Sequence, residues 1–83
     1  MRSTDQFEAL LLPHADALYR TAYRLTGDSS SAQDLVQETA LRAYRSFRQF
    51  DLGTNFRAWV FTILNHTLIN EYRRRCRSPT GRR

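Results

Sequence analysis

Apolar and small residues recur at every third or fourth position through most of this 83-residue chain. A spacing of 3.6 residues places such side chains on one side of an α-helix, whereas a half-buried strand would need strict alternation. Three segments carry the repeat, and we expect these stripes to form the core: Phe7, Leu11, Leu18, Ala22 and Leu25; Ala32, Val36, Thr39, Ala40, Ala43 and Phe47; and Val60, Leu64 and Leu68, flanked by Phe61, Ile63 and Tyr72. The pattern predicts an all-α protein, a small bundle of three main helices.

The first helix is predicted to run from about Asp5 to Thr26. Gly27 follows directly and can adopt the left-handed conformation that commonly ends a helix. Pro13 lies inside the segment, lacks the backbone N–H that an interior helical position needs, and predicts a kink or a break into two pieces.

The second and third helices have their own boundary signals. Ser30 is a suitable N-cap for the second helix, which should extend to about Arg48. The third helix should begin near Phe56, with Thr54 or Asn55 as its N-cap. Residues 49–55 then form a short loop before the last helix.

The charges are distributed unevenly along the chain. Residues 1–72 contain seven arginines and all eight acidic residues, a balance of −1, whereas residues 73–83 contain six arginines and no acid. This distribution predicts that the C-terminal end of the molecule binds a polyanion. The alternative is a solvated tail, which would have the same composition. Residues 78–83 are expected to be a flexible basic tail after a domain at residues 1–77.

Few residues are suited to catalysis or metal binding. His14, His66 and Cys76 lack metal-ligand spacing, and neither a nucleophile–base pair nor a phosphate-binding glycine loop is present. We therefore expect no enzyme, no metal and no cofactor. With one cysteine and no long apolar run, the chain is predicted to be cytoplasmic, without membrane insertion.

The second helix has an unusual outward side. At 100° per residue, Leu41 lies almost opposite the apolar stripe. The side chains around it on this side are polar or charged: Asp34, Gln37, Glu38, Arg45 and Arg48. A single exposed leucine is common on protein surfaces, but a leucine framed in this way is also typical of a docking site for a partner helix.

The loop and the third helix combine groups that can bind a single nucleic-acid strand. Phe50 and Phe56 bracket the loop, which also holds Gly53 and Asn55. One side of the following helix, here called the polar stripe, carries Trp59, Thr62, His66, Asn70 and Arg73. Stacking, hydrogen bonds to base edges and phosphate contacts need these side chains. The alternative is a plain connector whose phenylalanines pack into the core, followed by a solvated face with Trp59 folded inward.

Two runs of residues resemble a signature of bacterial sigma factors. The first is Ser31–Thr39, which contains Asp-Leu-Val-Gln-Glu, followed by Ala43–Arg45. After Phe47 and Phe50, the second is Asn55–Leu64, which contains Phe-Arg-Ala-Trp. Each run alone is a weak signal, but both at this separation are specific. The chain resembles the promoter-melting domain, region two, of the extracytoplasmic-function group.

The resemblance implies roles for both surfaces. The second helix would dock on the β′ clamp helices of core RNA polymerase, through Asp34, Gln37, Glu38, Leu41 and Arg45. The loop and third helix would bind and melt the promoter minus-ten element, holding the non-template strand and a flipped base. The residues implied are Phe50, Asp51, Leu52, Gly53, Thr54, Asn55, Phe56, Trp59, Thr62, His66, Asn70, Arg73 and Arg74.

Further expectations follow from the same family. An anti-sigma factor is an expected partner, and residues 78–83 would begin a linker, since no segment matches the family's second promoter-reading domain. His66 stands where members commonly have Asn, and Asn65 points about 100° away, which predicts altered contacts there. Two other functions fit the residues: a helical protein-interaction module with an incidental basic tail, and a helix-turn-helix domain that reads duplex DNA.

Overall fold

A computed structural model describes residues 3–51 and 53–77 of the chain, and the side chains of residues 5–51 and 53–73. Helix α1 spans Ser3–Thr26, α2 spans Ser29–Arg45 and α3 spans Phe56–Arg77. A short 3-10 helix, η1, covers Phe47–Gln49 between α2 and α3. Every regular element in the described ranges is helical, and the predicted all-α bundle of three main helices is confirmed.

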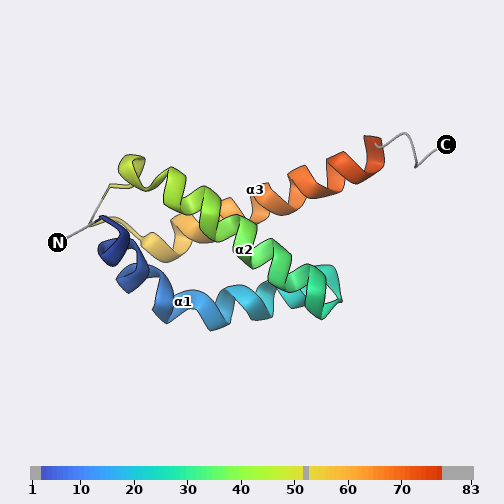
Figure 1. Cartoon of the computed structure of the whole chain (residues 1–83), viewed down its shortest axis with the longest axis horizontal. Coiled ribbons are helices and arrows are strands. Elements are labelled where there is room, and N and C mark those ends of the chain that lie inside the picture. The colour runs from blue at the N-terminus through green and yellow to red at the C-terminus, as the bar shows by residue number, and fades with distance from the viewer. Residues whose placement is uncertain (1–2, 52, 78–83) are drawn as a thin grey trace.

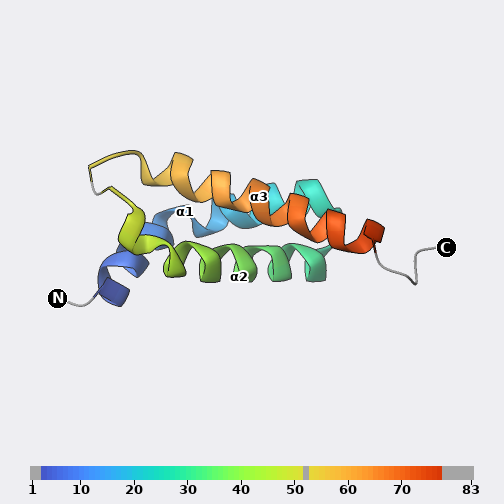
Figure 2. The ribbon, with the colours of Figure 1, turned by 90° about the horizontal axis from the view of Figure 1, so that it is seen from above.

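Helix α2 is the central element of the bundle. It runs back antiparallel to α1 after a short turn, and α3 then returns along it (Figures 1 and 2). Helix α2 packs extensively against both other helices, whereas α1 and α3 contact each other less. Because two of its sides are covered, α2 has one outward side that remains exposed. None of the described helices combines the length and the apolar character needed to cross a bilayer.

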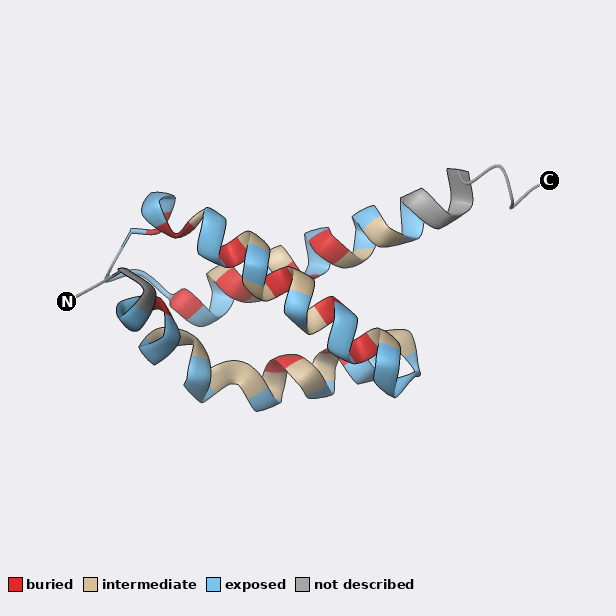
Figure 3. Ribbon diagram, in the orientation of Figure 1, coloured by how far each residue is buried: buried red, intermediate tan, exposed pale blue. Residues whose placement is uncertain are grey.

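The buried positions follow most of the predicted stripes and gather on the facing sides of the helices (Figure 3). Leu18, Val60 and Leu64 are almost completely enclosed. Two stripe predictions were wrong, because Leu25 is 48% exposed and Tyr72 is 67% exposed. Both lie toward the ends of their helices and line a surface groove instead.

Pro13 does not divide the first helix. Helix α1 remains one element from Ser3 to Thr26 with Pro13 inside it, so a break into two pieces is not found. Its first turns are instead inclined to the rest of the helix in both views (Figures 1 and 2). The missing N–H of Pro13 removes one hydrogen bond of the helix, which allows this bend without ending the helix.

The turn between α1 and α2 is closed by two local features. Gly27 has φ +74°, as predicted for the residue that ends α1, and its N–H donates to the Tyr23 carbonyl at 2.7 Å. The N-cap of α2 is Asp28, so the prediction of Ser30 was wrong. Asp28 Oδ2 accepts a hydrogen bond from the Ser31 N–H at 2.8 Å. This backbone bond, joined by one from the Ser31 side chain, holds the pKa of Asp28 below its ordinary value.

Helix α2 ends at Arg45, earlier than the predicted Arg48. The backbone continues after Arg45 with the tighter hydrogen bonding of a 3-10 helix. The Gln49 N–H donates to the Ser46 carbonyl at 2.9 Å, and the Phe50 N–H donates to the Phe47 carbonyl at 3.0 Å. The tighter turn buries both phenylalanines, whose rings stack with centroids 6.0 Å apart. Burial of this ring pair therefore accompanies the early end of the helix.

The cap of α2 predicts a pH effect that an asparagine would remove. A carboxyl whose pKa is lowered by folding stabilises the protein at pH values above the pKa that it has in the unfolded chain, about 3.9. That contribution is lost as the pH falls through the pKa of the folded state. Asp28→Asn keeps an oxygen acceptor at the N-cap but cannot titrate. Its melting temperature should therefore fall less than that of the wild type between about pH 5 and pH 2.

Thermal melts followed by circular dichroism across this range provide the measurement. Asp34→Asn, which changes an exposed carboxyl elsewhere on α2, is the matched control and should follow the wild type. Equal acid sensitivity of the wild type and Asp28→Asn would contradict the role given to the ionised cap.

Candidate partner-docking and nucleic-acid surfaces

The outward side of α2 is open, as the sequence predicted. Leu41 is 51% exposed, and Asp34, Gln37 and Arg45 are exposed with it. Glu38 is partly buried and accepts a hydrogen bond from Arg42 Nε at 3.2 Å. An exposed leucine beside carboxylates on a rigid helix can enter an apolar recess of a partner while the carboxylates meet cations around it.

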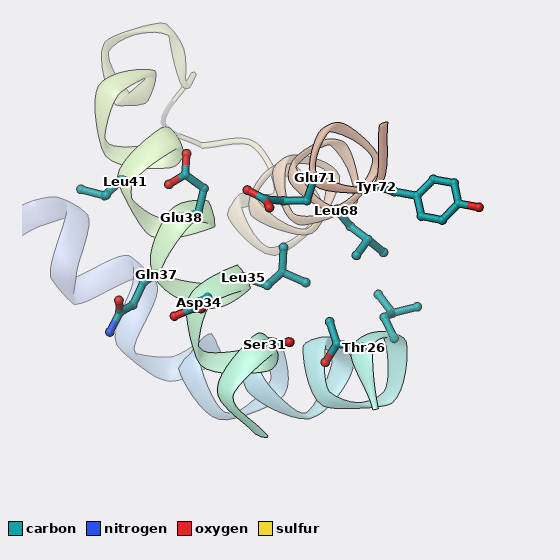
Figure 4. A pocket seen from close by; sticks show the side chains of 11 residues that line it. Thr26, Ser31, Asp34, Leu35, Gln37, Glu38, Leu41, Leu68, Glu71 and Tyr72 are labelled. Carbon is teal, nitrogen blue, oxygen red and sulfur yellow. The ribbon is translucent and has the colours of Figure 1, made fainter. Parts of the chain in front are cut away.

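A groove runs along one side of this face, and we call it the acidic groove. It has a volume of about 470 Å³ and lies between α2 and the ends of α1 and α3 (Figure 4). Leu35 from α2 and Leu68 from α3 point into it, while Glu38 and Glu71 lie along one rim (Figure 4). Its lining comprises Leu25, Thr26, Ser31, Asp34, Leu35, Gln37, Glu38, Leu41, Leu68, Glu71 and Tyr72.

A second groove lies between α2 and the first half of α1, and we call it the apolar groove. It has a volume of about 580 Å³ and shares Gln37 and Leu41 with the acidic groove. The full lining is Phe7, Glu8, Leu11, Gln37, Ala40, Leu41 and Tyr44. The contribution of α1 could not be predicted from the sequence, because a helical wheel of α2 alone does not show which residues of another helix lie beside it.

The loop before α3 is tied down by hydrogen bonds. Of the two predicted N-cap candidates, Thr54 and Asn55, the structure selects Asn55. Its Oδ1 atom accepts a hydrogen bond from the Ala58 N–H at 3.1 Å. The Thr54 hydroxyl and N–H both donate to the Asp51 carbonyl, at 2.7 and 3.0 Å. Gly53 has φ +103°, a conformation that L side chains rarely adopt, which explains the glycine. Leu52, a predicted DNA contact, lies outside the described residues.

The two phenylalanines that bracket the loop do not offer free ring faces. Phe50 is 8% exposed and Phe56 is 6% exposed, and their rings meet edge to face at 5.3 Å between centroids. Trp59 is half-buried against them, 4.8 Å from Phe50 and 5.5 Å from Phe56. The structure therefore corrects the expectation that Phe50 and Phe56 present rings to a ligand. They hold the loop against the core.

The rest of the polar stripe is accessible. Thr62, His66, Asn70 and Arg73 are all exposed along one side of α3. The Thr62 hydroxyl donates to the Ala58 carbonyl at 2.9 Å, which leaves its lone pairs available to an incoming donor. The side chain of Arg74, also predicted to contact DNA, lies outside the described residues. No group of three or more potential metal ligands occurs among the residues that the structure describes.

This helical domain, with the open outward side of α2 and the exposed polar stripe of α3, is of the sigma-factor class. The family model described as sigma-70 region 2 matches residues 10–78, and the chain belongs to that family. Curated relatives are named as extracytoplasmic-function (ECF) RNA polymerase sigma factors. The resemblance read from the two motifs, to region two of an ECF sigma factor, is confirmed.

Three relatives illustrate the similarity. SigL of Mycobacterium tuberculosis is 46% identical over 66 residues, which cover 78% of this chain and 37% of SigL. SigE of Mycolicibacterium smegmatis is 41% identical over 71 residues, 86% of this chain and 27% of SigE. EcfG of Rhodopseudomonas palustris is 40% identical over 77 residues, 93% of this chain and 42% of EcfG. The chain thus spans less than half the length of each relative.

Burial of Phe50 predicts a large loss of stability when its ring is removed. Phe50→Ala should lower the free energy of unfolding by about 3–5 kcal/mol, because buried apolar contacts are lost and a cavity remains. Phe50→Leu retains more of the buried volume and should lower it less. Urea titrations followed by circular dichroism measure both changes. A stability equal to that of the wild type in Phe50→Ala would show that the ring is not a core element.

Proposed function

We propose that this chain is a non-enzymatic domain for transcription initiation, which docks on core RNA polymerase through α2 and binds the promoter minus-ten element through α3. The observation that carries the proposal is the open outward side of α2, with Leu41 half-exposed among acidic side chains, in a chain of the sigma-70 region 2 family. The relatives' names, RNA polymerase sigma factors, support the same assignment.

The proposed polymerase contact is the pair of β′ clamp helices. Leu41 supplies an apolar anchor at the centre of the face, a position where truncation typically weakens binding most. Asp34 and Glu38 lie beside it in the acidic groove and suit a cationic helix. Gln37 adds a neutral hydrogen-bonding group, and Arg45 extends the face toward the end of α2.

The proposed DNA contact is the non-template strand of the minus-ten element. Thr62, His66 and Asn70 offer hydrogen-bonding groups in one exposed line, and Arg73 adds a cation at its end. A strand held along this line needs base contacts for recognition and phosphate contacts for position. Holding the strand open would let the domain take part in promoter melting.

The loop before α3 is proposed to receive one flipped base. Asp51, Thr54 and Asn55 are exposed there, and the buried phenylalanines beneath them hold the loop in place. The Oδ1 atom of Asn55 is engaged as the cap of α3, so the amide NH2 group is the part proposed to meet a base. Extruding a base costs a few kcal/mol, which a preformed site can offset.

Regulation by an anti-sigma factor would act on these same surfaces. A protein that covers the outward side of α2 would exclude the polymerase, because one face cannot hold two partners. The second candidate function is a helical protein-interaction module with an incidental basic end, and the half-buried state of Trp59 favours it. That alternative gives no nucleic-acid phenotype for variants of the polar stripe.

The polymerase contact predicts a selective defect for Leu41→Arg. The variant should keep its helicity and melting temperature, because Leu41 is 51% exposed. Its binding to core polymerase should weaken by about 2 kcal/mol or more, roughly 30-fold, as expected for an interface anchor. Surface plasmon resonance or fluorescence anisotropy with labelled domain provides the measurement.

Ile69→Arg is the matched control for this experiment. Ile69 is 46% exposed, lies on α3 and lines neither groove. The control adds the same charge at a similar exposure and should bind polymerase as the wild type does. Equal affinity of Leu41→Arg and the wild type would remove α2 as the docking face.

The proposed base site predicts a sequence-dependent defect for Asn55→Ser. Serine is also a strong N-cap, so this variant should fold normally, whereas Asn55→Ala should lose about 1 kcal/mol of stability. If the Asn55 amide meets a base, Asn55→Ser should weaken binding of the preferred single strand more than binding of strands with the other three bases.

Fluorescence anisotropy on short single strands that differ at one position measures this effect, with the matching duplex as reference. The single strand should bind more tightly than the duplex, because no base has to be unstacked and unpaired. A loss of equal size for all four bases would mean that the loop positions the strand without reading it. Unchanged binding in Asn55→Ser and in Arg73→Ala would favour the protein-interaction module.

A further inference from the structure

The acidic groove carries charge of a single sign. Three carboxylates line it, those of Asp34, Glu38 and Glu71, and the described residues of its lining include no cation. Glu38 uses Oε2 to accept a hydrogen bond from Arg42 Nε, which leaves Oε1 for a second donor. A cation that enters the groove is therefore attracted by several carboxylates at once.

The basic tail, residues 78–83, has the complementary charge. Its sequence is Ser-Pro-Thr-Gly-Arg-Arg, with two arginines and no acid, and it lies outside the described residues. It follows α3, whose residues Glu71 and Tyr72 line the acidic groove. In both views the end of α3 and the turn between α1 and α2 lie at the same end of the bundle (Figures 1 and 2). The groove is thus the acidic surface nearest to the start of the tail.

We infer that the basic tail occupies the acidic groove of its own chain, with Arg82 and Arg83 on the carboxylates of Asp34 and Glu38. The charges of the two segments carry this inference, and the contact does not depend on the proposed function. It assigns to the groove an occupant whose chemistry is given by the sequence.

The other lining residues suit arginine side chains. Leu35 and Leu68 point into the groove (Figure 4) and can cover the aliphatic part of an arginine while its guanidinium stays at the rim. Tyr72 is 67% exposed and belongs to the same lining, so its ring face is accessible to a guanidinium. The groove therefore offers an arginine both charge and apolar contact.

The tail is long enough to reach the groove. Helix α3 rises about 1.5 Å per residue, which places its last residue, Arg77, roughly 8 Å beyond Tyr72. Six extended residues span about 20 Å, so residues 82–83 can lie beside the groove once the chain turns back. Pro79 and Gly81 are residue types that favour such a turn.

Tethering compensates for the weakness of exposed ion pairs. Pairs between exposed charges are individually weak and are screened by salt. A segment linked to its site by a few residues, however, meets that site at an effective concentration of about millimolar. A contact with a dissociation constant of that order would be half-occupied within the chain.

Occupation of the groove would compete with a partner on α2. Asp34, Glu38 and Leu41 line the groove and also belong to the surface proposed for the polymerase. A partner that binds there would displace the tail and release Arg82 and Arg83, which could then meet DNA phosphates. This consequence, unlike the contact itself, rests on the proposed function.

Nuclear magnetic resonance of the 83-residue chain tests the contact directly. The amide signals of Asp34 and Leu35 should shift when salt is raised to about 1 M, which shortens the Debye length to about 3 Å and releases the tail. In the double variant Arg82→Gln with Arg83→Gln this salt-dependent shift should be lost. Asp34→Asn should reduce the corresponding shift of the Arg82 and Arg83 Nε–H signals.

The matched control removes two arginines elsewhere. Arg48 and Arg73 are exposed and line neither groove, so Arg48→Gln with Arg73→Gln changes the net charge equally and should keep the shift of the wild type. All substituted positions are exposed or in the tail, and circular dichroism should report unchanged helicity. A shift that is lost in both double variants would be an effect of net charge and would overturn the inference.

Two further results would also overturn it. Equal salt-dependent shifts in the wild type and in Arg82→Gln with Arg83→Gln would show that the tail does not occupy the groove. Shifts that grow with protein concentration would place the arginines in the groove of a second copy instead of their own.

Affinity for core polymerase separates the contact from the proposed function. If the groove is half-occupied by the tail, Arg82→Gln with Arg83→Gln should bind polymerase about twofold more tightly than the wild type. Weaker or equal binding by this variant would contradict competition for the groove. Absence of polymerase binding by the wild type would remove the proposed function, whereas the salt-dependent shifts would still decide the contact.

Discussion

Packing among aromatic rings is the interaction on which the rest of this structure depends. Phe7 of α1 meets Phe47 of η1 at 5.3 Å and Phe56 of α3 at 6.2 Å, both edge to face. Phe50 and Trp59 close the cluster at 4.8 Å. Because every main helix or its flanking turn contributes, the rings connect the bundle at one end and position the loop before α3. A loop held in this way can present polar groups at fixed positions without being covered itself.

The same packing explains why α2 can present a partner surface. Ala32 and Ala43 are fully buried on its inner side, and such small residues let helices approach closely. Thr39 is also fully buried, and its hydroxyl is satisfied by donating to the Leu35 carbonyl at 2.7 Å. The inner side of α2 is thus engaged in the core. Its outer side is not used by the core and carries Leu41, which is 51% exposed.

Sequence periodicity was sufficient to predict the three helices, the position of Gly27 and the outward side of α2, since these depend on local spacing. It could not choose between Ser30 and Asp28 as the cap, because both residue types cap well and the turn geometry decides. It also left open whether Phe50 faces a ligand or the core, and the 3-10 turn after Arg45 settles that point. The grooves depend on residues far apart in sequence, such as Leu25 and Tyr72. No pattern within one helix shows such a pairing.

Helix α3 keeps surfaces of opposite charge apart. Glu71 lines the acidic groove, whereas Arg73 lies two positions later at the end of the exposed polar stripe. Two positions correspond to about 200° around a helix, so the carboxylate and the guanidinium point to nearly opposite sides. A cationic partner in the acidic groove and a phosphate backbone on the polar stripe would therefore lie on different sides of α3. Since exposed charges interact weakly beyond about 8 Å at physiological ionic strength, the body of the helix limits repulsion between the groove carboxylates and a bound strand. The surfaces proposed for the polymerase and for DNA therefore do not overlap on this helix.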